Sequence, residues 1–283
     1  GVGGGRPLGA VRMTGANDAR GRPALLGACY DASSSFLRGP AEAPAAIRRE
    51  LQSTASNAWS ERLQLIEPGV AWEDAGDVAL GDDPRAAIEQ AVDALLSAGR
   101  RPLVLGGDHS ITYPVLRALR RHHPRLTILH LDAHNDLYES FEGDRYSHAC
   151  PFARIMEEGL ADQLVQVGIR AMTRHQREQA DRFGVDVVDM RRWVAGERFA
   201  LRHPVYLSLD VDVLDPAFAP GVSHREPGGL SVREVLSVVQ GIDQPMVGAD
   251  LVEYNPRRDL DEVTAPVCAK LIKEIVAQMQ RHD

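Results

Sequence analysis

Residues 126–136 read LTILHLDAHND, an apolar run that changes abruptly into a run of acids and an imidazole. The apolar part, Leu126–Leu131, has the length of a buried strand, and strands buried on both faces are almost continuously hydrophobic. In the extended segment that follows, residues two apart share a face. Asp132, His134 and Asp136 therefore project together, and we expect two carboxylates and an imidazole where a strand ends.

The same alternation of elements continues on both sides of this stretch. The pattern predicts further strands at 102–105, 164–167, 185–188, 205–209 and 246–252, and helices at 84–98, 112–122, 151–158 and 263–279. The charged residues at 177–182 indicate the solvated face of one more helix. Ser231 and Glu234 form a capping box that opens another helix. Strands that alternate with amphipathic helices are typical of βαβ units. We expect a single α/β domain at 24–283, with a central, mainly parallel sheet flanked by helices, after a flexible leader at 1–23.

Composition and charge exclude several classes of function. The chain has 283 residues and a formal net charge of -8, whereas nucleic-acid binding has a basic electrostatic footprint. Its apolar runs are shorter than the roughly 18 residues that span a membrane. Three cysteines without a CxxC pair are typical of a reducing compartment. We expect no nucleic-acid or membrane partner and a cytoplasmic location, with a trimmed organelle-targeting leader as the alternative.

Four polar clusters follow predicted strands. They read GGDHS at 106–110, DAHND at 132–136, LDVDVLD at 209–215 and VEYNP at 252–256. In open α/β sheets, ligands bind at the carboxyl ends of the strands. The four clusters are therefore expected to face one pocket.

The clusters offer a set of ligands for metal ions. Carboxylates that converge without a cation repel one another strongly. A lone DxD is often a turn or helix cap, but the conjunction of the clusters favours metal binding. Nitrogen and oxygen ligands without a thiolate fit two divalent ions roughly 3.5–4 Å apart, and they favour manganese over zinc. The candidate ligands are His109, Asp132, His134, Asp136, Asp210 and Asp212.

The motifs GGDHS, DAHxD and SxDxDxxDP, in this order, resemble those of the ureohydrolase family of arginases and agmatinases. The likeness runs from about Ala24 to near the C-terminus. It is closest to plant-type arginases, in SSSFLRGP, FEGDRYSHA and GADLVEYNPRRD, and that group is similar to bacterial agmatinases. One departure is Asn135, where Thr, Pro or Ser is expected; its side chain is expected to point away from the metals.

The resemblance implies a role for each candidate residue. It implies a sheet of about eight strands, two Mn²⁺ ions per subunit and a homo-oligomer of three or six copies. Asp136, His148 and Glu253 are the implied catalytic residues: Glu253 would hold the guanidinium group, and His148 would relay a proton or contact the substrate. One manganese would take His109, Asp132, Asp136 and Asp210, and the other would take His134, Asp132, Asp210 and Asp212, with Asp132 and Asp210 bridging.

The chemistry of the residues agrees with this reading. A guanidinium carbon resists attack, so hydrolysis at neutral pH needs a hydroxide, which a metal supplies by lowering the pKa of water. A carboxylate matches the forked donors of a guanidinium, and a histidine can bring a proton to the leaving amine. We expect release of urea from arginine or, as a close second, agmatine. Acidic residues in the 137–148 loop favour agmatine, whereas Arg145 favours the carboxylate of arginine.

Three other readings stay open at this point. The chain could hydrolyse another guanidino acid, or be a metal-binding relative without catalysis, although a complete ligand set argues against the latter. It could also be an amide hydrolase similar to histone deacetylases, which would carry one catalytic metal. Among the remaining polar residues, we expect His130 in the core or beside the ligands, His224 at the pocket rim and Asp215 as a brace for its loop.

Overall fold

The structure is a computed structural model that describes residues 21–282. A sheet of parallel strands forms its centre. The strands are β1 (Pro23–Ala28), β2 (Glu73–Asp77), β3 (Arg101–Gly106), β4 (Thr127–Leu131), β5 (Gln163–Val167), β6 (Asp186–Val188), β7 (Val205–Asp210) and β8 (Met246–Val252). They pair in the order β2-β1-β3-β8-β7-β4-β5-β6, and every neighbouring pair is parallel. Within the described residues the sheet thus has the expected eight strands, and it is wholly rather than mainly parallel.

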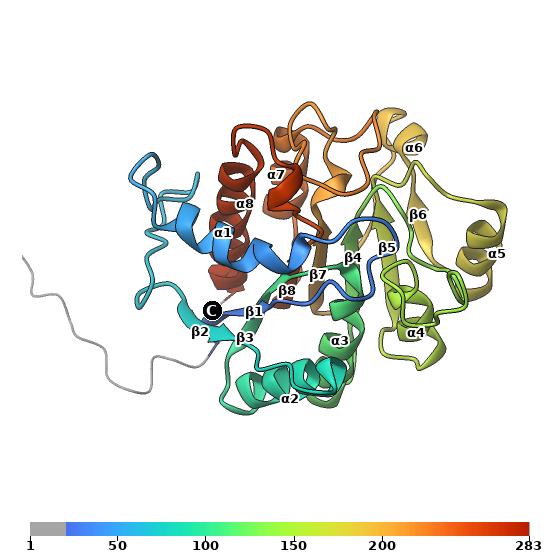
Figure 1. The fold of residues 1–283 in the computed structure, drawn as a ribbon, viewed down its shortest axis with the longest axis horizontal. Helices are drawn as coiled ribbons and strands as arrows, with labels where there is room; N and C mark the ends of the chain where they lie inside the picture. Colours follow the sequence, from blue (N-terminus) through green and yellow to red (C-terminus); the bar gives the residue numbers. More distant parts are fainter. Residues whose placement is uncertain (1–20, 283) are drawn as a thin grey trace, which may run out of the picture.

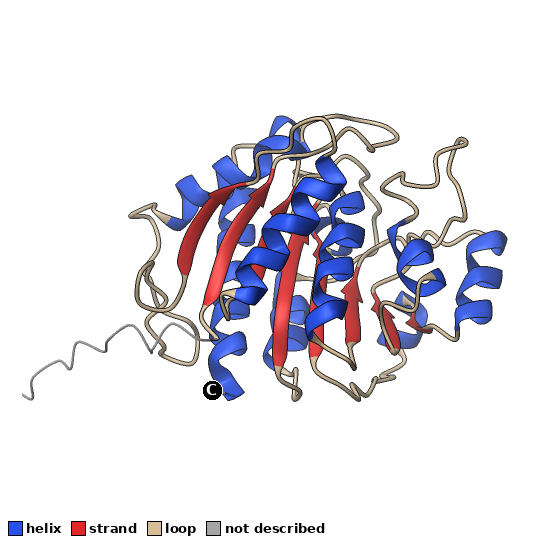
Figure 2. Cartoon of the chain, turned by 90° about the horizontal axis from the view of Figure 1, so that it is seen from below, coloured by secondary structure: helices blue, strands red, loops and turns tan. Residues whose placement is uncertain are grey.

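Helices cover both faces of this sheet (Figures 1 and 2). Residues of α1, α7 and α8 belong to the apolar cluster on one face, and residues of α2, α3 and α4 to the cluster on the other. Successive residues of β3 alternate between the two clusters, as the period of a strand requires. The helices are α1 (Ala43–Leu51), α2 (Pro84–Ser97), α3 (Thr112–His122), α4 (Pro151–Glu157), α5 (Arg174–Phe183), α6 (Met190–Val194), α7 (Val232–Gln240) and α8 (Thr264–Met279).

The predicted elements are all present, and the Ser231–Glu234 capping box opens α7 as expected. Strands β1 and β2 and helices α1 and α6 were not predicted from the sequence. Residues 1–20 of the expected leader at 1–23 lie outside the described residues. Its last residue, Pro23, is already the first residue of β1.

The strand order brings the polar clusters together. Strands β3, β8, β7 and β4 are consecutive in the sheet, although β8 and β7 come much later in the chain. The chain leaves β3 and crosses over these two strands to form β4, which creates a topological switch point. The clusters after these four strands therefore meet at the carboxyl edge of the central sheet.

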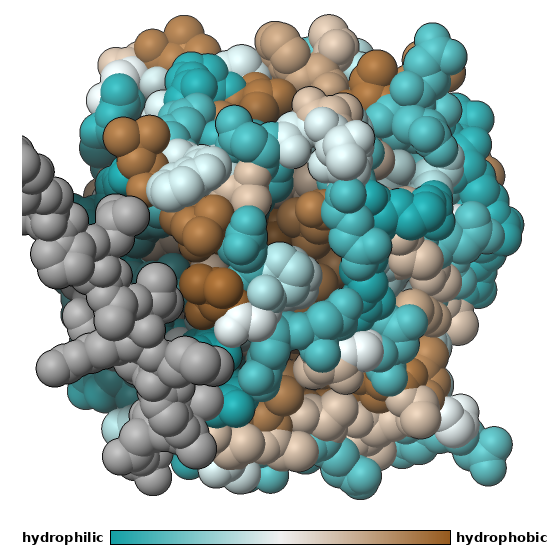
Figure 3. Space-filling view, turned by 90° about the vertical axis from the view of Figure 1, so that its left-hand side faces the viewer, coloured by the Kyte–Doolittle hydropathy of each residue, from teal (hydrophilic) through white to brown (hydrophobic). Residues whose placement is uncertain are grey.

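Hydrophilic and hydrophobic side chains are interspersed on the face shown in Figure 3. Between residues 21 and 282, no helix combines the length and apolar character needed to cross a membrane.

Candidate metal centre

All six predicted metal ligands lie at the carboxyl ends of the central strands. His109 begins a short 3-10 turn after β3, and Asp132 follows β4 directly. Asp210 is the last residue of β7, and Asp212 lies in the next 3-10 turn. Five of the six residues are buried, whereas His134 is partly exposed.

Gly107 allows β3 to end close to neighbouring backbone. A Cβ atom at this position would lie 1.8 Å from the carbonyl oxygen of Tyr30, so no larger residue fits without a shift of the backbone. The carbonyl oxygen of Gly107 in turn accepts a hydrogen bond from the backbone N–H of Glu253 at 2.9 Å. The glycine therefore brings the segment that carries His109 beside the segment that carries Glu253.

The Nδ1 atom of His109 faces three carboxylates. It lies 3.1–3.2 Å from one oxygen of each of Asp132, Asp136 and Asp210. Nevertheless, this buried nitrogen has no hydrogen-bond partner among the described residues. An unpartnered buried nitrogen among carboxylates is the arrangement expected around a cation.

The contacts of the other ring nitrogen, Nε2, determine which nitrogen of a neutral His109 carries the proton. Nε2 lies 2.9 Å from the Ser208 hydroxyl, and that hydroxyl donates to Asp250 at 2.8 Å. Because a hydroxyl has a single proton, Ser208 accepts from His109 Nε2–H. The Nδ1 atom of a neutral His109 therefore presents a lone pair to the three carboxylates.

The charges of this cluster fit a bound divalent metal. Burial lowers the pKa of His109, but the three carboxylates outweigh it and hold that pKa well above its usual value. Burial and the charges of Asp212 and Asp132 raise the pKa of Asp210 well above its usual range. The cluster thus attracts a positive charge at Nδ1, and a metal ion would satisfy the lone pair and the carboxylates together.

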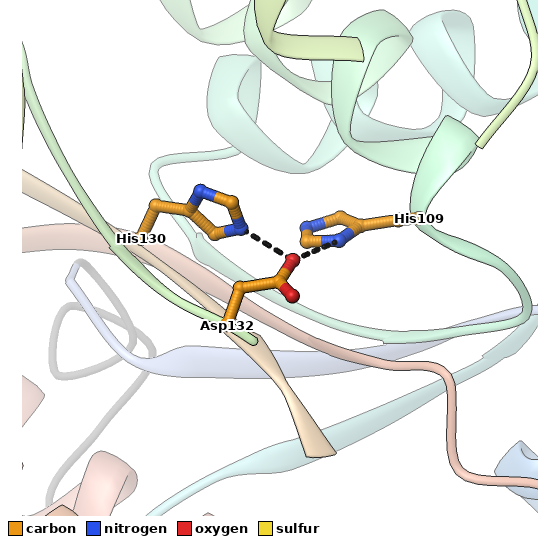
Figure 4. A group of neighbouring side chains, drawn as sticks. All are labelled: His109, His130 and Asp132. Atoms are coloured by element: carbon orange, nitrogen blue, oxygen red, sulfur yellow. Dashed lines mark hydrogen bonds and ion pairs between the residues drawn. The ribbon is translucent and has the colours of Figure 1, made fainter. Parts of the chain in front are cut away.

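A second group of ligands shares Asp132 with the first. His134 Nδ1 lies 3.1 Å from Asp212 Oδ2 and 3.4 Å from Asp132 Oδ1, and these three residues could hold a metal. His109, His130 and Asp132 form another group of potential ligands. Figure 4 shows both imidazoles directed at the same oxygen of Asp132. His130 was expected in the core or beside the ligands, and it lies there.

The metal-ligand cluster opens into a cavity of about 170 Å³. Among its lining residues are two predicted catalytic residues from outside the strands, His148 and Glu253, together with the expected rim residue His224. Aromatic side chains of Tyr138 and Phe141 form part of its wall. The cavity combines carboxylates, imidazoles and apolar surface, which suits a small cationic substrate.

Glu253 connects the cavity to the metal ligands. Its Oε1 atom accepts hydrogen bonds from the backbone N–H of His109 at 2.8 Å and from His148 Nδ1 at 2.7 Å. No described residue donates to its Oε2 atom. Glu253 and Asp136 have φ angles of 65° and 47°, a strained region for residues other than glycine that is concentrated at functional sites.

His148 is held from both sides. Burial lowers its pKa, but Glu253 outweighs this effect and raises the pKa to about 9. On the opposite side of the ring, Nε2 accepts the backbone N–H of Ser35 at 3.1 Å and lies 2.7 Å from Ser35 Oγ. The pairing with Glu253 fits a residue that gains or loses a proton during a reaction.

Sequence reasoning missed Ser35 and the residue that holds its loop. Asp108 is fully buried and accepts hydrogen bonds from Ser33 N–H at 3.0 Å and from the Ser34 hydroxyl at 3.2 Å. The buried carboxylate thereby ties the serine loop to the end of β3 and places Ser35 against His148. The sequence signal was present in GGDHS and SSSFLRGP, but nothing in either motif indicates that the two segments touch.

Asp215 has the bracing role expected for it. Its Oδ1 atom accepts from Ala217 N–H at 2.9 Å, and its Oδ2 atom accepts from Gly228 N–H at 2.7 Å and from Gly229 N–H at 3.2 Å. These bonds close the loop that carries His224 and hold it over the cavity.

The sheet is parallel, and a cluster of carboxylate and imidazole side chains lies at the carboxyl ends of its central strands. This combination is typical of metal-dependent enzymes. Comparison with known proteins then identifies the family: the model of the Arginase family matches residues 22–277. The chain belongs to this family, as its motifs predicted, and its homologues are ureohydrolases.

Relatives include both arginases and agmatinases. Arginase 1, mitochondrial, of Arabidopsis thaliana is 45% identical over 96% of this chain and 84% of its own length. The agmatinase of Bacillus anthracis is 34% identical over 89% of this chain and 90% of its own length. The solved structure of an arginase from Medicago truncatula superimposes with a TM-score of 0.87 at 43% identity, and the match covers 92% of this chain and 88% of that one.

Proposed function

We propose that this chain is a dinuclear manganese hydrolase that releases urea from the guanidino group of L-arginine. The observation that carries this proposal is the convergence of three carboxylates on the unpartnered Nδ1 atom of His109, two of them (Asp136 and Asp210) in the cavity that Glu253 also lines. A metal centre and a guanidinium acceptor thus lie in one small cavity. That juxtaposition is what hydrolysis of a resonance-stabilised cation requires.

Asp132 and Asp210 would bridge the two metal ions. Asp132 approaches His109 with one oxygen and His134 with the other, which supports a shared position between two sites. When bound, the ions supply Lewis acidity that lowers the pKa of water and stabilises negative charge in the transition state. The remaining ligands would be His109 and Asp136 for one ion, and His134 and Asp212 for the other.

Glu253 would bind the substrate through its free oxygen. Its Oε1 atom already accepts two hydrogen bonds, whereas Oε2 accepts none from the described residues. Glu253 lines the cavity, and a carboxylate oxygen without a donor is a strong acceptor for a guanidinium N–H, because the bond is charge-assisted. The substrate carbon would then lie between Glu253 and the metal ligands.

His148 would bring the proton that the leaving amine needs. The pKa, raised to about 9, favours a protonated imidazole at neutral pH; its Nε2 proton would point to Ser35 Oγ in place of the Ser35 N–H that Nε2 accepts, and would be the proton delivered. Glu253 stabilises the charged ring through Nδ1, and Ser35 contacts Nε2. After donation, either residue can steady the neutral ring until a proton returns from solvent.

Agmatine is the second candidate substrate, and one observation favours it. Among the described residues that line the cavity, there is no lysine or arginine to pair with the carboxylate of arginine. Arg145 does not line the cavity, and its guanidinium lies 3.0 Å from Glu157. Arginine remains the first choice because the relatives with higher identity are named arginases.

A substrate panel with a urea readout tests the proposal. Manganese-loaded protein would be assayed with arginine, with agmatine and with a guanidino acid that lacks the α-amino group. We expect the highest kcat/KM for arginine. Faster turnover of agmatine would keep the ureohydrolase chemistry and reverse the substrate choice, whereas no urea from any compound would favour a non-catalytic metal-binding relative.

The proposal extends to assembly and location. A homo-oligomer of three or six copies is expected, and light scattering of the purified protein measures its mass. A cytoplasmic location is proposed, although the names of several plant relatives place those proteins in mitochondria or chloroplasts. Fractionation of cells that express the complete protein would decide between these compartments and would show whether residues 1–23 act as a trimmed leader.

A further inference from the structure

A chain of buried polar groups, none of which lines the cavity, leads to Asp132. His130 and Gln166 are paired neighbours on β4 and β5, and both are fully buried. Gln166 Nε2 lies 2.7 Å from the carbonyl oxygen of Asn135 and 3.0 Å from His130 Nδ1. His130 Nε2 lies 2.7 Å from Asp132 Oδ2 (Figure 4).

The direction of each hydrogen bond follows from the carbonyl group of Asn135. A backbone carbonyl can only accept, so the Gln166 atom that faces it must be the amide nitrogen rather than the amide oxygen. The same nitrogen carries a second hydrogen, which it donates to His130 Nδ1. The Nδ1 atom is therefore the unprotonated nitrogen of a neutral His130, and Nε2–H donates to Asp132.

This order of donors argues against His130 as a metal ligand. His130 is close enough to His109 and Asp132 to share a metal with them. However, its Nδ1 lone pair accepts from Gln166, and its Nε2 atom carries the proton that Asp132 accepts. Neither nitrogen has a lone pair left for a metal ion.

The ring of His130 is also fixed in orientation. It stacks on Phe152, with ring centroids 3.9 Å apart and planes inclined by 26°. The other oxygen of Asp132 accepts from the backbone N–H of His134 at 2.6 Å. Both oxygens of Asp132 are thus anchored by donors, which sets the rotation of the carboxylate that faces both candidate metal sites.

We propose that His130 is a positioning residue that orients the carboxylate of Asp132 for metal binding, and that Gln166 sets the tautomer of His130 which makes this possible. The effect on metal binding rests on the proposed function. The hydrogen-bond chain itself does not, because it consists of protein groups alone. Loss of such an outer partner is expected to weaken metal binding about 10- to 100-fold.

The tautomer can be measured directly in the metal-free protein. Nitrogen-15 NMR of the imidazole side chains distinguishes protonated from unprotonated ring nitrogens. We expect His130 to carry its proton on Nε2 alone, and we expect the Gln166→Leu variant to populate the other tautomer as well. A proton on Nδ1 of the wild-type ring would overturn the proposal.

Variants test the effect on metal binding. His130→Phe keeps an aromatic ring against Phe152 but cannot donate, whereas His130→Gln retains an N–H donor. Chelator competition should show manganese held about 10- to 100-fold more weakly by His130→Phe, with partial recovery in His130→Gln. His122→Gln, at an exposed position of α3, is the control and should match the wild type.

Two results separate this proposal from a general packing defect. The metal-free His130→Phe protein should unfold cooperatively, close to the temperature of the metal-free wild type, and wild-type metal affinity in this folded variant would overturn the positioning role. If the wild type bound no divalent metal, the proposed function would be wrong. The NMR measurement of the His130 tautomer would still show whether the hydrogen-bond chain runs as described.

Discussion

His148 Nδ1 lies 2.7 Å from Glu253 Oε1, and the same oxygen accepts the backbone N–H of His109. One carboxylate oxygen therefore links the candidate proton donor to the segment that carries a metal ligand. The second oxygen of Glu253 is left for a substrate. Because the two oxygens of Glu253 have different partners, substrate binding, proton transfer and metal binding can be tested separately.

Glu253→Gln should impair substrate binding and turnover while leaving the metal content unchanged. The amide removes the negative charge that a guanidinium needs, and hydrogen bonds to charged groups contribute about 1.5–3 kcal/mol, or roughly 10- to 100-fold in kcat/KM. Steady-state kinetics and metal analysis measure both effects. The exposed Glu178→Gln substitution on α5 is the matched control. Loss of manganese with an unchanged KM would show that Glu253 belongs to the metal site instead.

His148→Asn should lower kcat by about 10²- to 10⁴-fold, the usual cost of losing a general acid–base group. The asparagine amide can still donate to Glu253 in place of Nδ1, but it offers no titratable nitrogen beside Ser35. Both metals should remain bound, as metal analysis would show. An unchanged rate would transfer the proton-donor role to bulk water or to another residue of the cavity, such as His224.

Activity should rise from neutral pH and fall above about pH 9. The rise reflects formation of hydroxide as the attacking species, and the fall reflects loss of the His148 proton as the pH passes its pKa of about 9. Because this pKa is raised from 6.5, the contribution of the His148–Glu253 pair to stability is fully present below pH 6.5 and is lost as the pH passes about 9. A profile of kcat against pH that stays level to pH 11 would contradict the role of His148.

Asp132→Asn should retain less manganese than His109→Asn. Asp132 approaches both imidazoles of the proposed metal sites, whereas His109 belongs to one of them. Metal content after dialysis of the two purified variants measures the difference, with His122→Gln as a control. Equal loss in both variants would argue against a bridging position for Asp132.

The sequence predicted the central strands of the sheet because they are apolar and short. It did not predict β2, whose residues EDAGD are mostly exposed at the sheet edge. Two acids of this strand, Asp74 and Asp77, pair with Arg48 of α1, a contact between distant segments that no local period reveals. Strand β1 begins with proline, which strands tolerate at their first residue but which weakens any local strand signal.

The candidate ligands could be predicted because each follows an apolar run in the chain. Their supporting groups could not, since Ser35, Ser208 and Gln166 act through contacts across 36 to 113 residues. A serine or glutamine has no charge that demands a partner, so only the fold shows which of them meets an imidazole. The ligands were thus predictable from local sequence, whereas the residues that support them are brought into contact only by the topology of the fold.

The dependence of urea release on bound manganese shows whether catalysis needs two metal ions. Metal-free protein would be loaded stepwise with Mn²⁺, and the initial rate with saturating arginine would be plotted against the bound manganese per chain. If catalysis needs both ions, the rate becomes maximal at two ions per chain and returns to zero on chelation. A maximal rate at one ion, or an unchanged rate in the metal-free protein, would contradict the dinuclear mechanism.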